Sequence, residues 1–151
     1  MNEITIRKKI SRVGEALTIS KKRVNKFGGY TYWNCSDILN EVKKYYGEFE
    51  FFIMLCDTIE VVGERTYVKA TATFVCTETN ESISVTAYAR EPLSVKGQSE
   101  AQITGASSSY ARKYALSGLL SLDDEQDADA TNNHGKTKPV TTNQKIEEDI
   151  F

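Results

Sequence analysis

Apolar and polar residues alternate in the middle of the chain, which predicts three β-strands. The strand-forming runs are 49–62, 66–77 and 82–90, and turn-forming residues at 63–64 and 79–81 separate them. The apolar positions of the second run are Val68, Ala70, Ala72, Phe74 and Cys76. Alternation of this kind is typical of an antiparallel sheet with one covered face. We therefore predict an antiparallel meander of three or more strands.

Apolar residues recur at helical spacing on both sides of this centre. Ile10, Val13 and Leu17 predict an amphipathic first helix whose other positions are largely basic. Residues 99–120 contain no proline and predict a long C-terminal helix. The expected fold class is α+β, with the meander packed against helices and the long helix lying on one face of the sheet.

A second helix and a basic loop are predicted between the first helix and the strands. Ser36 is a candidate N-cap for a helix that begins at Asp37 and ends at Gly47. The loop at 21–30 is rich in Lys and Arg and contains Gly28 and Gly29, which predict a tight turn or hairpin. On the third strand run, Tyr88 and Arg90 share a parity, and they are expected to lie on one face with Lys69 if the strand register allows it.

The charge is distributed unevenly, although the net charge is only −2. Residues 1–30 carry eight Lys or Arg against two acids, whereas residues 121–151 carry eight acids against three lysines. The basic N-terminal segment and the acidic C-terminal segment indicate that the N-terminal part of the chain meets phosphate while the C-terminal part repels it.

Several classes of protein are disfavoured by the composition. The length suits one compact domain, and no segment resembles a signal peptide or a spanning helix, so we expect a cytoplasmic protein. Cys35, Cys56 and Cys76 are far apart in the sequence and only His134 accompanies them, so we expect buried thiols, with neither a disulfide framework nor a zinc site. No Gly-Lys-Ser/Thr loop is present, and we expect no ATP dependence and no cofactor.

The C-terminal helix carries a distinctive motif. It reads Tyr-Ala-Arg-Lys-Tyr-Ala-Leu at 110–116, follows a Gly- and small-residue-rich segment at 97–109, and runs into an aspartate cluster at 123–129. Together with Tyr-Thr-Tyr at 30–32, this pattern resembles the Erf (essential recombination function) family over roughly residues 5–129. The segment at 105–108 is richer in serine than the family pattern, and Gln126 and Ala128 interrupt the acidic cluster.

The resemblance implies a phage or prophage protein that coats single-stranded DNA and pairs complementary strands. Such a protein works without nucleotide, assembles as a ring or filament, and has no catalytic centre. On this interpretation residues 1–129 form the annealing domain, and residues 130–151 form a disordered acidic tail, because their polar composition cannot bury enough apolar surface. The expected location is the cytoplasm of the bacterial host.

Binding of single strands requires basic side chains for phosphate and aromatic faces for bases. The candidate DNA-binding residues are Lys21, Lys22, Arg23, Lys26, Tyr30, Tyr32, Lys69, Arg90, Lys96, Arg112 and Lys113. Because Arg112 and Lys113 project about 100° apart on a helix, at most one of them is expected to point into a groove. A solvated helix face is the alternative for both, but the motif favours DNA contact. Tyr110 and Tyr114 are one turn apart, a spacing that favours a core stripe over a stacking platform.

Two acidic segments near the C-terminus have several possible roles. Asp123, Asp124, Asp127 and Asp129 are of the residue type that binds Mg²⁺, but helix capping, contacts with a neighbouring subunit and simple solvation are the alternatives, and we expect no metal. The last residues are Glu147, Glu148, Asp149, Ile150 and Phe151. They resemble the acidic tip of bacterial single-stranded DNA-binding proteins, and this resemblance implies recruitment of host replication or repair proteins, with a purely solubilising tail as the alternative.

Three further functions compete with annealing. The first is a barrel-type single-stranded DNA-binding protein that protects strands without annealing them. The second is a metal-dependent nuclease that uses the aspartates, and the third is an interaction protein whose basic face meets acidic proteins. Salt-sensitive DNA binding distinguishes the last of these from the others.

Overall fold

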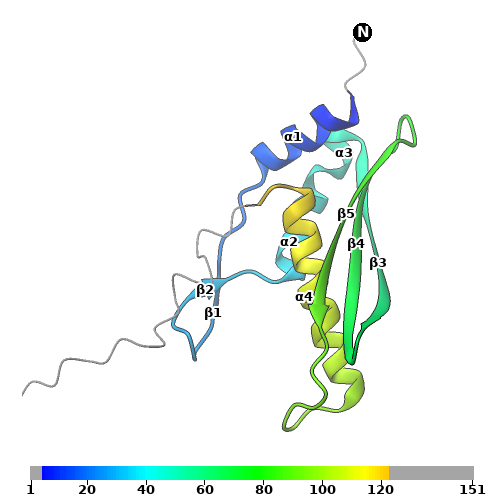
Figure 1. The fold of residues 1–151 in the computed structure, drawn as a ribbon. Helices are drawn as coiled ribbons and strands as arrows, with labels where there is room; N and C mark the ends of the chain where they lie inside the picture. The colour runs from blue at the N-terminus through cyan, green and yellow to red at the C-terminus, as the bar shows by residue number, and fades with distance from the viewer. Residues whose placement is uncertain (1–4, 123–151) are drawn as a thin grey trace, which may run out of the picture.

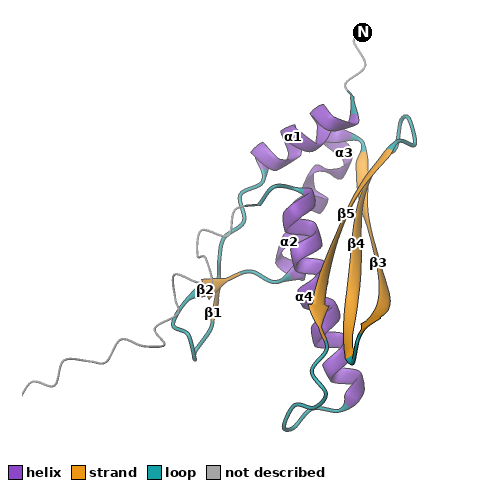
Figure 2. Cartoon of the chain, viewed as in Figure 1, coloured by secondary structure: helices purple, strands orange, loops and turns teal. Residues whose placement is uncertain are grey.

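The computed structural model describes residues 5–122, which form a helical layer and a three-stranded sheet (Figures 1 and 2). The elements in chain order are α1 (Ile6–Ala16), β1 (Arg23–Val24), β2 (Thr31–Tyr32), α2 (Cys35–Val42), the 3₁₀ turn η1 (Lys43–Tyr45), α3 (Tyr46–Phe49), β3 (Phe51–Val62), β4 (Arg65–Cys76), β5 (Ser82–Arg90) and α4 (Glu100–Leu119). Helix α4 lies along one face of the sheet, while α1 crosses near one end and the β1–β2 hairpin projects away from it (Figure 1). The predicted α+β class is confirmed.

The sheet is an antiparallel meander in the order β3-β4-β5, as the alternation predicts. Its register is continuous from Phe51 opposite Cys76 to Val62 opposite Arg65, and the β3–β4 turn uses Gly63 at a φ of 62°. The apolar parity of β4 faces α4 and is buried, while the other parity is partly exposed. The sheet therefore has one covered and one open face.

Small side chains allow α4 to lie close to the sheet. Ala111 and Ala115 of α4 and Ala70 and Ala72 of β4 have no exposed surface. Larger core side chains fill the two ends, and near one of them the Phe51 ring stacks on Phe74 with 4.2 Å between the ring centroids. Burial of this continuous apolar layer fixes which face of α4 remains outside.

The boundaries of the second helix differ from those predicted. Asn34, not Ser36, is the N-cap, because its side chain accepts from the backbone N–H of Asp37 while the Asp37 carboxylate accepts from the N–H of Asn34. Gly47 does not end the helical segment. The chain continues through η1 into α3, which ends at Glu50 in the left-handed region with a φ of 52°. In contrast, the prediction of α4 is confirmed, with Ser99 as its N-cap.

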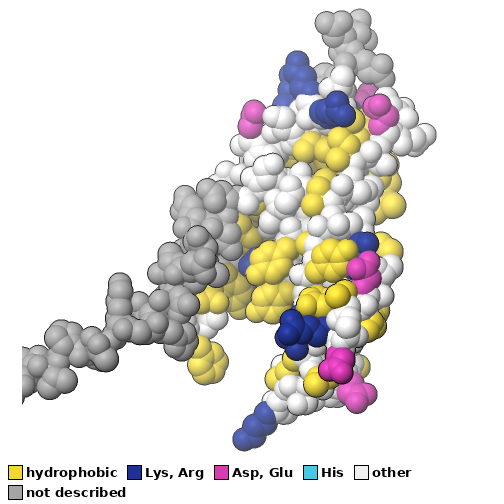
Figure 3. All heavy atoms as spheres, in the orientation of Figure 1, with side chains coloured by type: hydrophobic (Ala, Val, Ile, Leu, Met, Phe, Trp, Pro, Cys, Tyr) yellow, Lys and Arg dark blue, Asp and Glu magenta, His cyan; other side chains and the backbone are white. Residues whose placement is uncertain are grey.

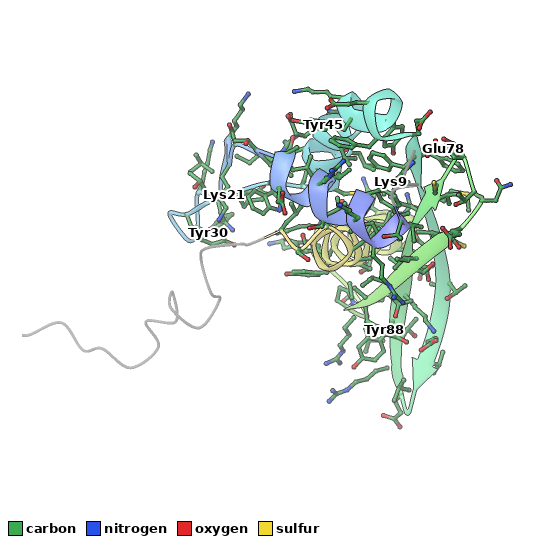
Figure 4. The ribbon with its side chains drawn as sticks, turned by 90° about the horizontal axis from the view of Figure 1, so that it is seen from above. Lys9, Lys21, Tyr30, Tyr45, Glu78 and Tyr88 are labelled. Carbon is green, nitrogen blue, oxygen red and sulfur yellow. The ribbon has the colours of Figure 1, made fainter. Side chains whose placement is uncertain are left out.

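Two side chains differ in burial from the prediction. Cys35 and Cys76 are buried as expected, but Cys56 is exposed on β3, where its parity places it on the open face. Lys9 of the basic first helix is only 5% exposed and pairs with Glu78, next to it in Figure 4. Its methylene stem covers the core while its ammonium group reaches the carboxylate.

Candidate nucleic-acid interface

The outer surface of α4 presents two tyrosines, contrary to the prediction that favoured a core stripe. Tyr110 and Tyr114 are 59% and 50% exposed, and their rings stack with centroids 6.5 Å apart at an interplanar angle of 28°. The Lys113 ammonium group lies 5.4 Å from the centre of the Tyr114 ring. We call Tyr110, Lys113 and Tyr114 the tyrosine face. Because Ala111 and Ala115 face the sheet, this helical face points away from the core.

Pockets flank Tyr110 on both sides. The β5–α4 pocket, of about 310 Å³, is lined by Tyr88, Arg90, Pro92, Val95, Tyr110 and Tyr114, among others. The β2–α4 pocket, of about 230 Å³, has Tyr32, Trp33, Ser109, Tyr110 and Lys113 in its lining. Figure 3 shows hydrophobic side chains gathered on this side of the molecule, with Lys and Arg side chains near them. A chain lying across α4 would meet aromatic surface bordered by positive charge.

Arg112 and Lys113 have different surroundings, as their separation on the helix predicts. The Arg112 guanidinium binds Asp57 of β3, with Nε 3.0 Å and 2.9 Å from the two carboxylate oxygens and Nη2 2.9 Å from Oδ2. Ser108 donates to the same carboxylate at 2.5 Å. These hydrogen bonds raise the pKa of Arg112 above its ordinary value. Arg112 thus holds α4 against β3, whereas Lys113 belongs to the tyrosine face.

The predicted hairpin forms, and it carries several of the candidate residues. Arg23 makes a two-point ion pair with Asp37, at 2.7 Å and 3.1 Å, and this pair lowers the pKa of the carboxyl group. Asn25 donates to the Tyr30 hydroxyl at 2.8 Å, and the Tyr30 and Tyr32 rings meet edge to face at 6.2 Å. Figure 4 shows Lys21 and Tyr30 together on this hairpin, away from the sheet.

The hairpin and the residue before it carry the exposed cations Lys22 and Lys26. Lys22 adds to the positive charge near Asp37. The Lys21 ammonium group lies 4.8 Å from the centre of the Trp33 ring. Trp33 itself is buried and leads from β2 into α2, so it joins the hairpin to the surface beside α4.

The strand register brings Lys69, Tyr88 and Arg90 to one face, as expected. Lys69 lies directly opposite Tyr88, with its ammonium group 5.6 Å from the ring centre, and Arg90 is opposite Tyr67. Lys69 also pairs with Glu60 at 2.9 Å, which raises the pKa of the lysine and offsets its charge. Arg90 lines the β5–α4 pocket, and Lys96 is exposed in the loop between β5 and α4.

Comparison of the sequence with models of protein families identifies the family of this chain. Residues 6–149 match the sequence model of the ERF superfamily. The chain belongs to the ERF superfamily. A similar ERF relative is the essential recombination function protein of Salmonella phage P22, which is 46% identical over 121 residues.

That alignment covers 80% of this ERF chain and 57% of the phage P22 protein. The chain therefore spans little more than half of the length of the relative. No solved structure gives a significant match. The fold is therefore described from the structure of this chain alone.

Three of the predicted residues of this ERF protein, Arg23, Lys69 and Arg112, form ion pairs with carboxylates that the structure identifies. Tyr32, Arg90 and Lys113 line the pockets beside Tyr110. The remaining candidates lie on the hairpin or next to it, except Lys96 in the β5–α4 loop: Lys21, Lys22, Lys26 and Tyr30. The predicted DNA-binding residues did not include Tyr110 and Tyr114, although the small residues after each of them, Ala111 and Ala115, indicate that the neighbouring face of the helix is the buried one.

Some predicted features of the ERF chain lie outside the described residues. These are the aspartates at 123–129, His134 and the tip at 147–151. Within residues 5–122, no three His, Cys, Asp or Glu side chains are grouped so that they could hold a metal ion. The same part of the chain contains no helix that is long and apolar enough to cross a membrane.

Proposed function

We propose that this ERF protein binds single-stranded DNA and anneals complementary strands without ATP, as an oligomer, in homologous recombination of a phage or prophage. It acts by binding, not through a catalytic centre, in the cytoplasm of the bacterial host. Membership of the ERF superfamily and the name of the phage P22 relative support the recombination role.

The proposal for DNA binding is based mainly on one observation. Two stacked tyrosines are exposed on a helix beside a lysine. Larger exposed apolar patches mark interaction sites, and bases stack on aromatic rings regardless of sequence. Tyr110 and Tyr114 offer such a platform, and Lys113 and Arg90 lie where phosphates beside it would be neutralised. Lys22 and Lys26 near the hairpin and Lys96 in the β5–α4 loop add exposed positive charge.

Annealing, and not only protection, is favoured by the open arrangement of this surface. The described residues form an open three-stranded sheet with free edges at β3 and β5, so they do not supply the closed barrel of the strand-protecting alternative. A strand lying over α4 leaves most base edges accessible to a second strand, as pairing requires. The interaction-protein alternative is separated from annealing by salt-sensitive binding to DNA, which it does not require.

A second part of the proposal concerns partners. Residues 147–151 combine three acids with a terminal Ile-Phe, a composition suited to a basic-rimmed apolar pocket on another protein. We propose that this tip recruits host replication or repair proteins. Loss of their co-purification on removing Ile150 and Phe151 is the expected result, and unchanged co-purification contradicts the proposal.

The deciding experiment follows the annealing of two complementary labelled oligonucleotides without ATP, with and without Mg²⁺. Acceleration in both conditions supports annealing. Binding without acceleration favours strand protection, and cleavage that requires Mg²⁺ favours a nuclease. Absence of salt-sensitive binding contradicts every DNA-binding function.

A further inference from the structure

The β2–α4 pocket has the size and lining of a site for one planar ring. Its volume of about 230 Å³ is below the range of about 300–1,000 Å³ that is usual for drug-sized ligands. The exposed Tyr110 ring belongs to its wall, and Tyr32 and Trp33 contribute from the hairpin side. Ser109 and Lys113 add polar groups from α4. An aromatic ring entering here would find apolar and aromatic surface with hydrogen-bonding groups around it.

Trp33 provides an independent sign of a ligand. The residue is only 6% exposed, and its indole nitrogen is buried without an acceptor among the described residues. An unpaired buried N–H is destabilising, and in native structures such groups are rare enough to require an explanation. Lys21 lies over the same indole in a second pocket that Trp33 also lines. The ring is thus held in place while its N–H lacks a partner.

We propose that the β2–α4 pocket receives a single nucleobase of the bound DNA strand, which stacks against Tyr110 and accepts a hydrogen bond from the Trp33 indole. This inference rests on the proposed binding of single-stranded DNA and names the subsite that holds one base. All four bases carry ring or carbonyl acceptors, so one N–H donor accommodates any of them. The pocket therefore suits binding without sequence preference.

Holding one base in each protomer is compatible with annealing. A base withdrawn from the stack fixes the position of the strand relative to α4, while the neighbouring bases remain on the outside. Lys113 lines the same pocket and would lie near the phosphate of the withdrawn nucleotide. The cost of unstacking is small for single strands, because no base pair is broken.

The chain contains one tryptophan, so its fluorescence reports on the surroundings of Trp33 alone. The probes are an oligothymidylate and an oligomer of equal length whose central residues are abasic, and fluorescence anisotropy measures the binding of each. We expect the oligothymidylate to change the Trp33 emission saturably and the abasic oligomer to bind with little change. Equal changes with both, or no change while binding persists, overturn the base pocket and leave the proposed function standing. Failure of both oligomers to bind overturns both.

Two variants separate base recognition from a general structural effect. Trp33→Phe keeps the aromatic ring and removes the N–H, and it should weaken oligothymidylate binding about two- to tenfold with little effect on the abasic oligomer. Ser109→Leu narrows the pocket from the surface of α4 and should suppress the emission change. Ala101→Leu, on an exposed part of the same helix, is the matched control. Equal effects of Ser109→Leu and Ala101→Leu contradict the assignment.

Discussion

Arg112 and Lys113 are neighbours in the motif of α4, and the structure predicts opposite consequences of replacing them. Arg112→Ala removes a guanidinium group that makes several contacts with Asp57, whose side chain is only 20% exposed. Ser108 also binds that carboxylate, so the pair connects α4 with β3 through a small network. Lys113→Ala instead removes a charge beside the Tyr114 ring. The first change should affect folding and the second should affect DNA binding.

The expected loss for Arg112→Ala is about 1–3 kcal/mol of unfolding free energy, because the charge-assisted hydrogen bonds to Asp57 are lost and the partly buried carboxylate loses its counter-charge while Ser108 remains bound to it. For a domain of this size it corresponds to a fall in Tm of about 4 °C per kcal/mol. Lys113→Ala should change Tm by little, while reducing the slope of log affinity for DNA against log salt by about one.

Thermal denaturation and salt titrations of oligonucleotide binding on both variants test this reasoning. The double variant Asp57→Asn/Arg112→Ala should show a coupling energy of about 0.5–3 kcal/mol in a double-mutant cycle. Additive effects of the two substitutions would refute the ion-pair account. So would an Arg112→Ala protein that keeps its wild-type Tm but loses DNA binding.

Three other perturbations have defined outcomes. Asp37→Asn should cost about 1 kcal/mol at neutral pH because it weakens the α2 capping box and the Arg23 pair. The folded-state pKa of the Asp37 carboxyl is lowered, so its contribution to the free energy of unfolding is complete above the unfolded-state pKa and disappears as the pH falls through the folded-state pKa. Urea denaturation should therefore show that the stabilities of the variant and the wild type converge in acid. Lys9→Ala should destabilise the protein by about 1–3 kcal/mol in the same assay, whereas Lys9→Met should cost less because it retains the buried stem next to Glu78. A chain ending at Asp129 should anneal oligonucleotides as fast as the full chain, and a loss of rate would contradict the predicted independence of the tail.

The strands and α4 were predictable because their signals are local. Alternation of apolar residues defines the faces of β4 and β5, and the Gly63-Glu64 turn sets the β3–β4 register. That register places Lys69 opposite Tyr88. In contrast, the start of α2 was misplaced because both Asn34 and Ser36 are good capping residues, and only the reciprocal bonds with Asp37 decide between them.

The site was harder to predict because it depends on contacts between distant segments. Tyr110 and Tyr114 have the spacing of a core stripe, but the close approach of Ala111 and Ala115 to the sheet turns both tyrosines outward. The partner of Arg112 lies 55 residues earlier, on another element. Periodicity identifies an apolar face of a helix, but it does not tell which of two adjacent faces packs on the sheet.

The central claim is that the tyrosine face of α4 binds the strands that are annealed. Its most direct test compares the annealing rate of complementary oligonucleotides with wild type, Tyr110→Ala/Tyr114→Ala and Met54→Ser, a control that is 52% exposed on the opposite side of the sheet. Loss of stacking should cost about 1–3 kcal/mol per base, so the double variant should bind at least about fivefold more weakly and anneal more slowly, at an unchanged Tm. Wild-type annealing by the double variant, or an equal loss with Met54→Ser, would contradict the account.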